Sequence, residues 1–288
     1  MKILKALGSG FARSLKAWKG IIIVWFCFLV IVFMVVVPFK SSMNAGLGNS
    51  MITEKLKDGI NIEVLGDLGK ILSEMIRSLS LGMMFLVLIG ILLNSFLSGG
   101  LFNSLKGGAG RFSGTEFFRT SAKYFWSFLG ITLLIGAILF VLGILIIAVP
   151  IGIVSSSATA EGTLYLAGLI CGIIYLAALI ILLLVADYAR AWQVRNETPA
   201  CFRALGFGFG RTFRRFLSSF PLMLLLLIFK VLFSLLVIAA IGPWRPEKGG
   251  GVFLLFVLSQ IIVFVNLLLK TWRYGSVTSL MEMNDTVQ

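Results

Sequence analysis

The sequence predicts an all-α, polytopic membrane protein with six transmembrane helices, and three observations predict it. Hydrophobic residues make up 59% of the 288 residues, and charged residues only 13%. The mean hydropathy is +1.03. A soluble domain carries about 25% charged residues, because its surface must face water. Finally, six continuous apolar stretches are each long enough to cross a hydrocarbon core of about 30 Å.

The six stretches predict one integral membrane domain over residues 1–288. None shows the alternation of apolar and polar residues that is typical of barrel strands. Pro38, Pro150 and Pro243 follow or close the first, third and fifth spans, as helix breakers do. An outer loop is predicted at 40–78, and from Ile62 onward its apolar residues recur at helical spacing, which predicts an amphipathic helix leading into the second span. The spans are expected at about 21–38, 79–101, 125–150, 164–186, 219–241 and 252–269.

The distribution of charge predicts the orientation. The formal net charge is +13, and most Lys and Arg residues fall before the first span, between spans two and three, and between spans four and five. Cytoplasmic loops carry such an excess, so both chain ends are predicted to be cytoplasmic. A basic protein can also bind nucleic acid, but no basic module stands apart from the membrane segments, so no nucleic-acid partner is expected.

The composition also argues against catalysis. The sequence has no histidine, the commonest general base and a frequent metal ligand. Its three cysteines, Cys27, Cys171 and Cys201, are far apart and form no CxxC motif. We therefore expect no enzyme activity, no catalytic residue, no metal site and no cofactor.

A short internal repeat suggests three parallel units of two spans each. Residues 6–16 and 204–214 are identical at six of eleven positions, and each segment leads into an outward-going span. Residues 122–125, before the third span, form a weaker copy of 12–15. Short matches in a biased composition also arise by chance, so the repeat is a hypothesis. Ser113–Glu116 fits a capping box, and Thr198–Pro199 fits a helix start.

The segment before the fifth span predicts a basic amphipathic helix in the inner headgroup layer. Phenylalanines lie beside the arginines there, and each basic residue near anionic lipid contributes about 1 kcal/mol. The alternative is ordinary topogenic charge without lipid specificity. The candidate contacts with anionic phospholipid are Arg203, Arg211, Arg214 and Arg215.

Lys230 lies at the centre of the fifth predicted span, about 16 Å from either interface at 1.5 Å per residue. A lysine at this depth is costly and is a functional-site hypothesis by default. Gln260 is predicted at a similar depth, with Asn94 and Asn266 nearer the cytoplasm. These four residues are a candidate polar site for an anionic headgroup or a substrate path. The alternative is that Lys230 meets only polar groups inside the bundle.

Two further patterns concern packing. Asp187 and Arg190 stand three residues apart at the inner end of the fourth span, where they can pair on one helix face. Their expected role is to end the span at the interface, with a substrate role as the alternative. Gly168 and Gly172 form a G-x-x-x-G pattern, which permits close helix packing within the chain, in a homo-oligomer or with another membrane protein.

Several short motifs resemble the six-helix membrane domain that is fused to some bacterial glycerophosphodiester phosphodiesterases, and its stand-alone relatives of unknown function. They are Ser98-Gly99-Gly100, Phe117-Phe118-Arg119, Tyr124-Phe125-Trp126 and Asp187-Tyr188-Ala189-Arg190. The resemblance implies a bacterial inner-membrane protein connected with lipid or envelope metabolism. It carries over no catalytic residue. The leading hypothesis is a non-catalytic accessory, scaffold or lipid-contacting component; the alternative is a small transporter or permease subunit with a polar site around Lys230.

Overall fold

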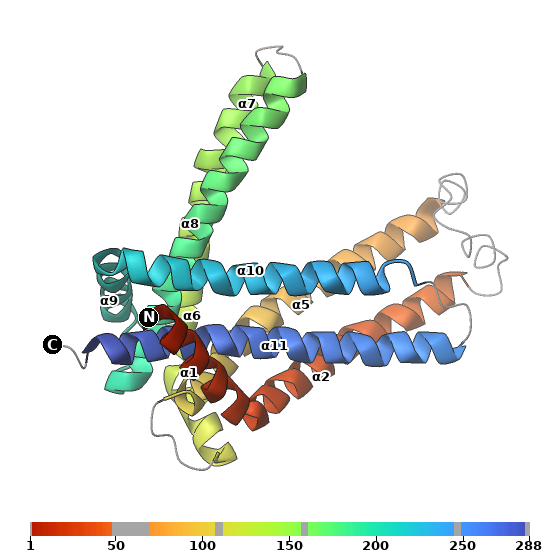
Figure 1. The fold of residues 1–288 in the computed structure, drawn as a ribbon. Coiled ribbons are helices and arrows are strands. Elements are labelled where there is room, and N and C mark those ends of the chain that lie inside the picture. The colour runs from red at the N-terminus through yellow and green to blue at the C-terminus, as the bar shows by residue number, and fades with distance from the viewer. Residues whose placement is uncertain (1, 48–68, 107–111, 157–160, 245–248, 286–288) are drawn as a thin grey trace. The chain divides into compact units, whose positions relative to one another are not determined.

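A computed structural model describes residues 2–47, 69–106, 112–156, 161–244 and 249–285 (Figure 1). All regular elements in these ranges are helices, and six of the helices are long and apolar enough to cross a membrane. The predicted all-α, polytopic membrane fold is therefore confirmed. In chain order the elements are α1 (Lys2–Lys16), α2 (Trp18–Leu47), α5 (Gly69–Ser104), α6 (Gly114–Gly143), η1 (Ile144–Ala148), α7 (Val149–Ser156), α8 (Glu161–Asn196), α9 (Cys201–Arg214), α10 (Phe216–Ile241) and α11 (Gly249–Asp285).

The chain, predicted to be one membrane domain, divides by its contacts into two compact units. The smaller unit is residues 24–94, which hold most of α2 and the first part of α5. Within it, a Cβ atom on Gly82 would lie 3.2 Å from Cγ1 of Val35, so the two helices pack closely there. The larger unit, residues 1–23 and 95–288, holds all the other elements.

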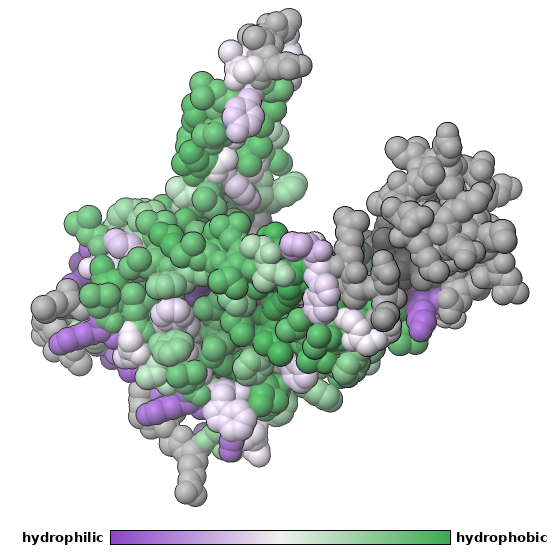
Figure 2. All heavy atoms as spheres, turned by 45° about the vertical axis from the view of Figure 1, so that its right-hand side comes forward, coloured by the Kyte–Doolittle hydropathy of each residue, from purple (hydrophilic) through white to green (hydrophobic). Residues whose placement is uncertain are grey.

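The helices that cross the membrane turn apolar side chains outward. On the arm formed by η1, α7 and α8, Leu145, Ile153 and Ile173 are each more than half exposed. Figure 2 shows hydrophobic side chains over the visible sides of this arm, at the top of the view. Exposed apolar area on this scale suits a lipid environment, because soluble monomers rarely expose large contiguous apolar patches.

Helix ends and proline positions test the local predictions. Ser113 caps α6 as the capping box predicts, and its hydroxyl accepts a hydrogen bond from the Glu116 amide at 3.4 Å. Pro243 follows the end of α10 as expected. The start predicted at Thr198 is wrong, because the N-cap of α9 is Ala200, which makes no side-chain cap.

Pro38 and Pro150 lie inside helices, so the helix ends predicted at these two prolines come too early in the chain. A proline lacks the amide hydrogen and crowds the carbonyl one turn before it. At Pro150 the chain accommodates this with a π-helical turn, Ile144–Ala148, directly before α7. Within the predicted outer loop, residues 40–47 continue α2, whereas residues 69–78 form the first turns of α5. From Gly69 onward this agrees with the helix that was predicted from Ile62 to lead into the second span, and residues 62–68 of that helix lie outside the described residues.

Three lead-in helices each pack against the end of an apolar helix from another part of the chain. The lead-in helices are α1, the first turns of α6 (residues 114–124), and α9. Their partners are the last parts of α11, α5 and α8 respectively, all within the larger unit. Figure 1 shows α1 lying against α11.

The lead-in helices α1 and α9 bury equivalent positions of the repeated segment. In α1 the buried residues are Ala6, Leu7, Gly10 and Ser14, and in α9 they are Ala204, Leu205, Gly208 and Thr212. The glycines make the closest approach, because a Cβ on Gly10 would lie 2.5 Å from the Ser276 amide nitrogen and one on Gly208 2.5 Å from the Val185 carbonyl oxygen. Small residues let helix backbones approach closely in membranes. This shared register supports the repeat hypothesis for these two units.

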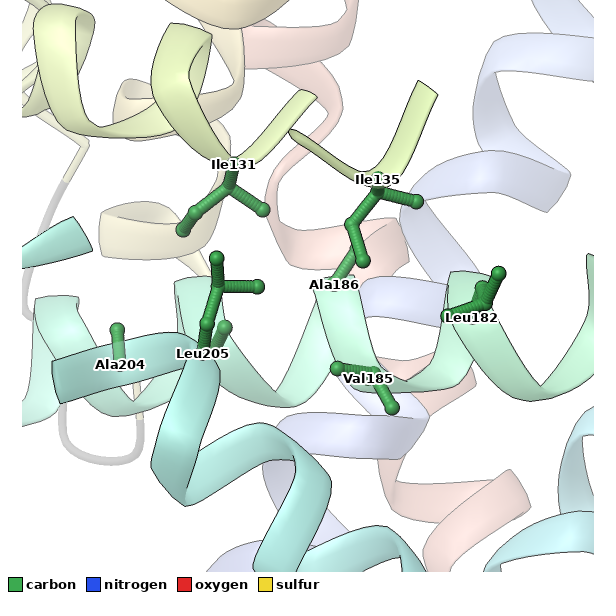
Figure 3. Packing of buried hydrophobic residues seen from close by; sticks show 8 residues of the cluster. Ile131, Ile135, Leu182, Val185, Ala186, Ala204 and Leu205 are labelled. Carbon is green, nitrogen blue, oxygen red and sulfur yellow. The ribbon is translucent and has the colours of Figure 1, made fainter. Parts of the chain in front are cut away.

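An apolar cluster fixes α9 against α8 and α6. Ile131 of α6 points toward Leu205 of α9, and Ile135 of α6 points toward Ala186 of α8; Val185 of α8 belongs to the same cluster (Figure 3). All five side chains are at most 8% exposed. At the contact between α1 and α11, the Trp272 indole donates a hydrogen bond to the Leu7 carbonyl at 2.9 Å.

Candidate functional site

A buried ionic trio joins α8 and α11. Arg273 of α11 places its Nε 2.8 Å from Oδ2 of Asp187, and its Nη2 donates to Oδ1 at 3.3 Å. Arg190, one turn along α8, places its Nη1 3.6 Å from Oδ1 of the same carboxylate. The Asp187 side chain is 0% exposed, Arg190 8% and Arg273 20%. One carboxylate therefore forms ion pairs with two guanidinium groups, and all three side chains are largely buried.

Residues of α6 complete the surroundings of the trio. The Nη2 of Arg190 donates to the Thr132 hydroxyl at 3.0 Å, and its guanidinium lies over the Phe128 ring at 5.9 Å. One turn further along α8, Gln193 donates to the buried Ser127 hydroxyl at 2.6 Å. These contacts fix the α8 side chains against α6. Buried polar groups of this kind are stable only when they are hydrogen-bonded.

Tyr274 forms the aromatic wall of the site. Its ring is 1% exposed and stacks on Phe102 of α5, with 4.5 Å between the ring centroids. The Arg273 guanidinium lies 5.2 Å and the Lys270 ammonium 5.8 Å from the Tyr274 ring centroid. Cations near an aromatic face are attracted by the ring quadrupole. The site therefore draws on the ends of α5, α8 and α11 together with α6.

Within the larger unit, the hydrogen bonds that the structure gives for the Gln260 and Asn266 side chains stay on α11 and do not join Lys230. The Lys230 side chain is exposed on α10. Gln260 donates only weakly to the neighbouring Ser259, at 3.5 Å, and Asn266 donates to the Ile262 carbonyl of its own helix, at 3.1 Å. Asn94 belongs to the smaller unit, so its place relative to these residues is not described. The substrate path around Lys230 stays a prediction.

The four predicted lipid-contacting arginines divide into two kinds. Arg203 and Arg214 are exposed on α9, and Arg215 is partly exposed directly after it. Arg211 points inward instead, and its Nη2 donates to the Met281 carbonyl of α11 at 3.3 Å. Arg13, at the equivalent position of the repeat, donates to Glu282 of α11 at 2.7 Å. This pair of equivalent arginines ties two lead-in helices to the end of the last span.

Neither family models, curated proteins nor solved structures match the chain. In the described ranges, no group of three or more Cys, Asp or Glu residues is placed to hold a metal ion.

Two of the three residues of the ionic trio could be paired from the sequence. The spacing of Asp187 and Arg190 predicts their pairing, and the structure confirms that pair at 3.6 Å. Arg273 was missed; it comes from a different span and forms the shorter ion pair. The available signal was the aspartate itself, the only acidic residue near the centre or inner end of a predicted span. A carboxylate at that depth is costly to bury, and it can pair with a second cation as well as with the neighbouring arginine.

Proposed function

We propose that the protein is a non-catalytic component of a bacterial inner membrane that contacts anionic lipid through its lead-in helices. In this proposal both chain ends are cytoplasmic, and α1 and α9 lie in the inner headgroup layer. The protein would act as an accessory or scaffold subunit whose membrane contacts depend on phospholipid charge. The charge asymmetry of the loops supports this orientation.

The observation that carries the proposal is that α9 is amphipathic, with one side packed on the protein and the other exposed. Its small residues are buried against α8, whereas Phe202 is 79% and Phe213 61% exposed on its other side. Arg203 and Arg214 are exposed beside these rings. Helix α1 repeats the arrangement, with Leu4 72% exposed among lysines. Exposed apolar rings interleaved with cations suit the boundary between acyl chains and phosphate groups.

Neutralising the two exposed arginines of α9 and the partly exposed Arg215 that follows it should remove most of the preference for anionic lipid. We expect the triple substitution Arg203→Gln, Arg214→Gln and Arg215→Gln to lower the selectivity for phosphatidylglycerol over phosphatidylcholine by about tenfold or more. Each cation near an anionic surface contributes about 1 kcal/mol. Selectivity is measured with spin-labelled lipids in proteoliposomes.

The matched control replaces the same three arginines with lysine, which keeps the charge and should keep the selectivity. If the glutamine variant binds phosphatidylglycerol as the native chain does, the arginines serve only to orient the protein. Raising the salt concentration should reduce the selectivity of the native chain, because exposed charges are screened.

The orientation has its own test. In a chain whose three cysteines are replaced by alanine, we expect Gly206→Cys to react with an impermeant maleimide only after the cells are permeabilised. Gly206 is exposed on α9 with open space around it. Ser155→Cys, exposed near the far end of α7, should react in intact spheroplasts. Labelling of Gly206→Cys in intact spheroplasts would place α9 outside and refute the proposal.

A further inference from the structure

The ionic trio of Asp187, Arg190 and Arg273 carries an excess of positive charge. With the carboxylate ionised the trio has a net charge of +1, and with it protonated +2. Asp187 and Arg190 are almost fully buried. Taking charges out of water is expensive unless they are paired, so a buried excess of this kind calls for an anion.

The other acidic residues whose side chains the structure describes pair elsewhere. Glu282 pairs with Arg13, Glu197 with Lys106, and Glu116 with Arg119. Each of these pairs is more exposed than the Asp187–Arg190 pair. Among the acidic residues whose side chains are described, Asp187 is therefore the only one in ion-pair contact with Arg190 and Arg273.

The two guanidinium groups also keep unused donors. A guanidinium has five N–H donors in a fixed fork. Arg190 directs Nη1 to Asp187 and Nη2 to Thr132, while its buried Nε has no hydrogen-bond partner in the described part of the chain. Arg273 donates a hydrogen bond to Asp187 only through Nη2, and its Nε, although 2.8 Å from Oδ2, likewise has no hydrogen-bond partner in the described part of the chain. Arg273 is the most exposed member of the trio, so its guanidinium is the group that a ligand can reach first.

We propose that the trio binds the phosphate group of an anionic ligand, one per chain, beside Tyr274. Arginine forks match phosphate oxygens in two-point contacts. Lys270 places a further cation near the same ring. This inference rests on the proposed function for its orientation, which puts the ends of α8 and α11 at the level of the inner headgroups. The phosphate comes from a phospholipid headgroup or from a free phosphate in the cytoplasm.

Opposite charge changes in the trio should have opposite effects on binding. Arg273→Gln leaves the neutral pair Arg190–Asp187, and we expect it to weaken the apparent affinity for phosphate by at least tenfold. Asp187→Asn raises the excess charge, and we expect it to tighten binding several-fold. A trio with a purely structural role predicts that both variants lower the melting temperature and that neither changes its dependence on phosphate.

The measurement is the thermal stability of the full chain in a maltoside detergent, which carries no phosphate. One arm adds dihexanoylphosphatidylglycerol, a second adds inorganic phosphate, and a third adds chloride at equal ionic strength. We expect stabilisation of the native chain in the lipid arm, the phosphate arm or both, and the arm that responds identifies the source. Equal melting temperatures in all three arms would overturn the inference.

Two further variants keep the test informative. Arg273→Lys keeps the charge but loses the fork, so it should fold and retain part of the response if Arg273→Gln fails to fold. The triple α9 variant with glutamine at 203, 214 and 215 should keep the full response. If that triple variant loses lipid selectivity while Arg273→Gln keeps its phosphate response, the proposed function stands and the phosphate site falls.

Discussion

Replacing Gly208 with alanine should destabilise the protein by about 1–3 kcal/mol, the usual cost of overpacking a close contact. A Cβ atom there would lie 2.5 Å from the Val185 carbonyl oxygen and 3.3 Å from Val185 Cγ1. The first of these is a backbone atom, which cannot rotate away. Helix α9 would have to move off α8, and the cluster around Leu205 would loosen. The loss should appear as a lower melting temperature in detergent.

The neighbouring glycine provides the control. A Cβ on Gly206 would meet nothing within 4 Å. Gly206→Ala should therefore leave stability unchanged or raise it by up to about 1 kcal/mol, the helix propensity of alanine over glycine. The pair Gly10→Ala and Gly8→Ala repeats the experiment on α1, where Gly10 meets the Ser276 backbone and Gly8 meets nothing. Equal effects of Gly208→Ala and Gly206→Ala would show that α9 does not pack as described.

The spans could be predicted from the sequence because they depend on composition over a long window. A run of about 20 apolar residues has few alternatives to a membrane helix. The start of α6 was also predictable, because the cap depends on two residues three apart, with the Ser113 hydroxyl accepting a hydrogen bond from the Glu116 amide. Pro150 was misjudged because the π-helical turn that accommodates it depends on an adjustment of the preceding backbone.

The candidate site was only partly predictable, for a different reason. Asp187 and Arg190 are neighbours on one helix, so their spacing in the sequence defines their contact. Arg273 is 86 residues away from Asp187, and nothing local marks it as the partner. Lys230 drew attention through its depth in a predicted span. Depth alone does not show which way a side chain points, and the structure exposes it on α10.

Replacing Asp187 with alanine should be the most damaging single change of charge in the protein. It leaves two guanidinium groups, Arg190 and Arg273, without their carboxylate in a buried setting. Removing one partner of a buried ion pair costs about 3–5 kcal/mol. Arg273→Ala should cost less, because Arg190 and Asp187 still neutralise each other. Both losses are measured by denaturant unfolding in phosphate-free detergent.

Glu282→Ala is the matched control, because it breaks a more exposed ion pair, with Arg13, whose two side chains are 26% and 25% exposed. Such a pair near the surface contributes up to about 1 kcal/mol. The double variant Asp187→Ala with Arg273→Ala should be more stable than the sum of the single losses predicts, since it removes a charge of each sign. Strict additivity would mean that the two side chains do not interact. A loss at Asp187 no larger than that at Glu282 would mean that the trio is hydrated, and the buried excess charge that calls for a phosphate would not exist.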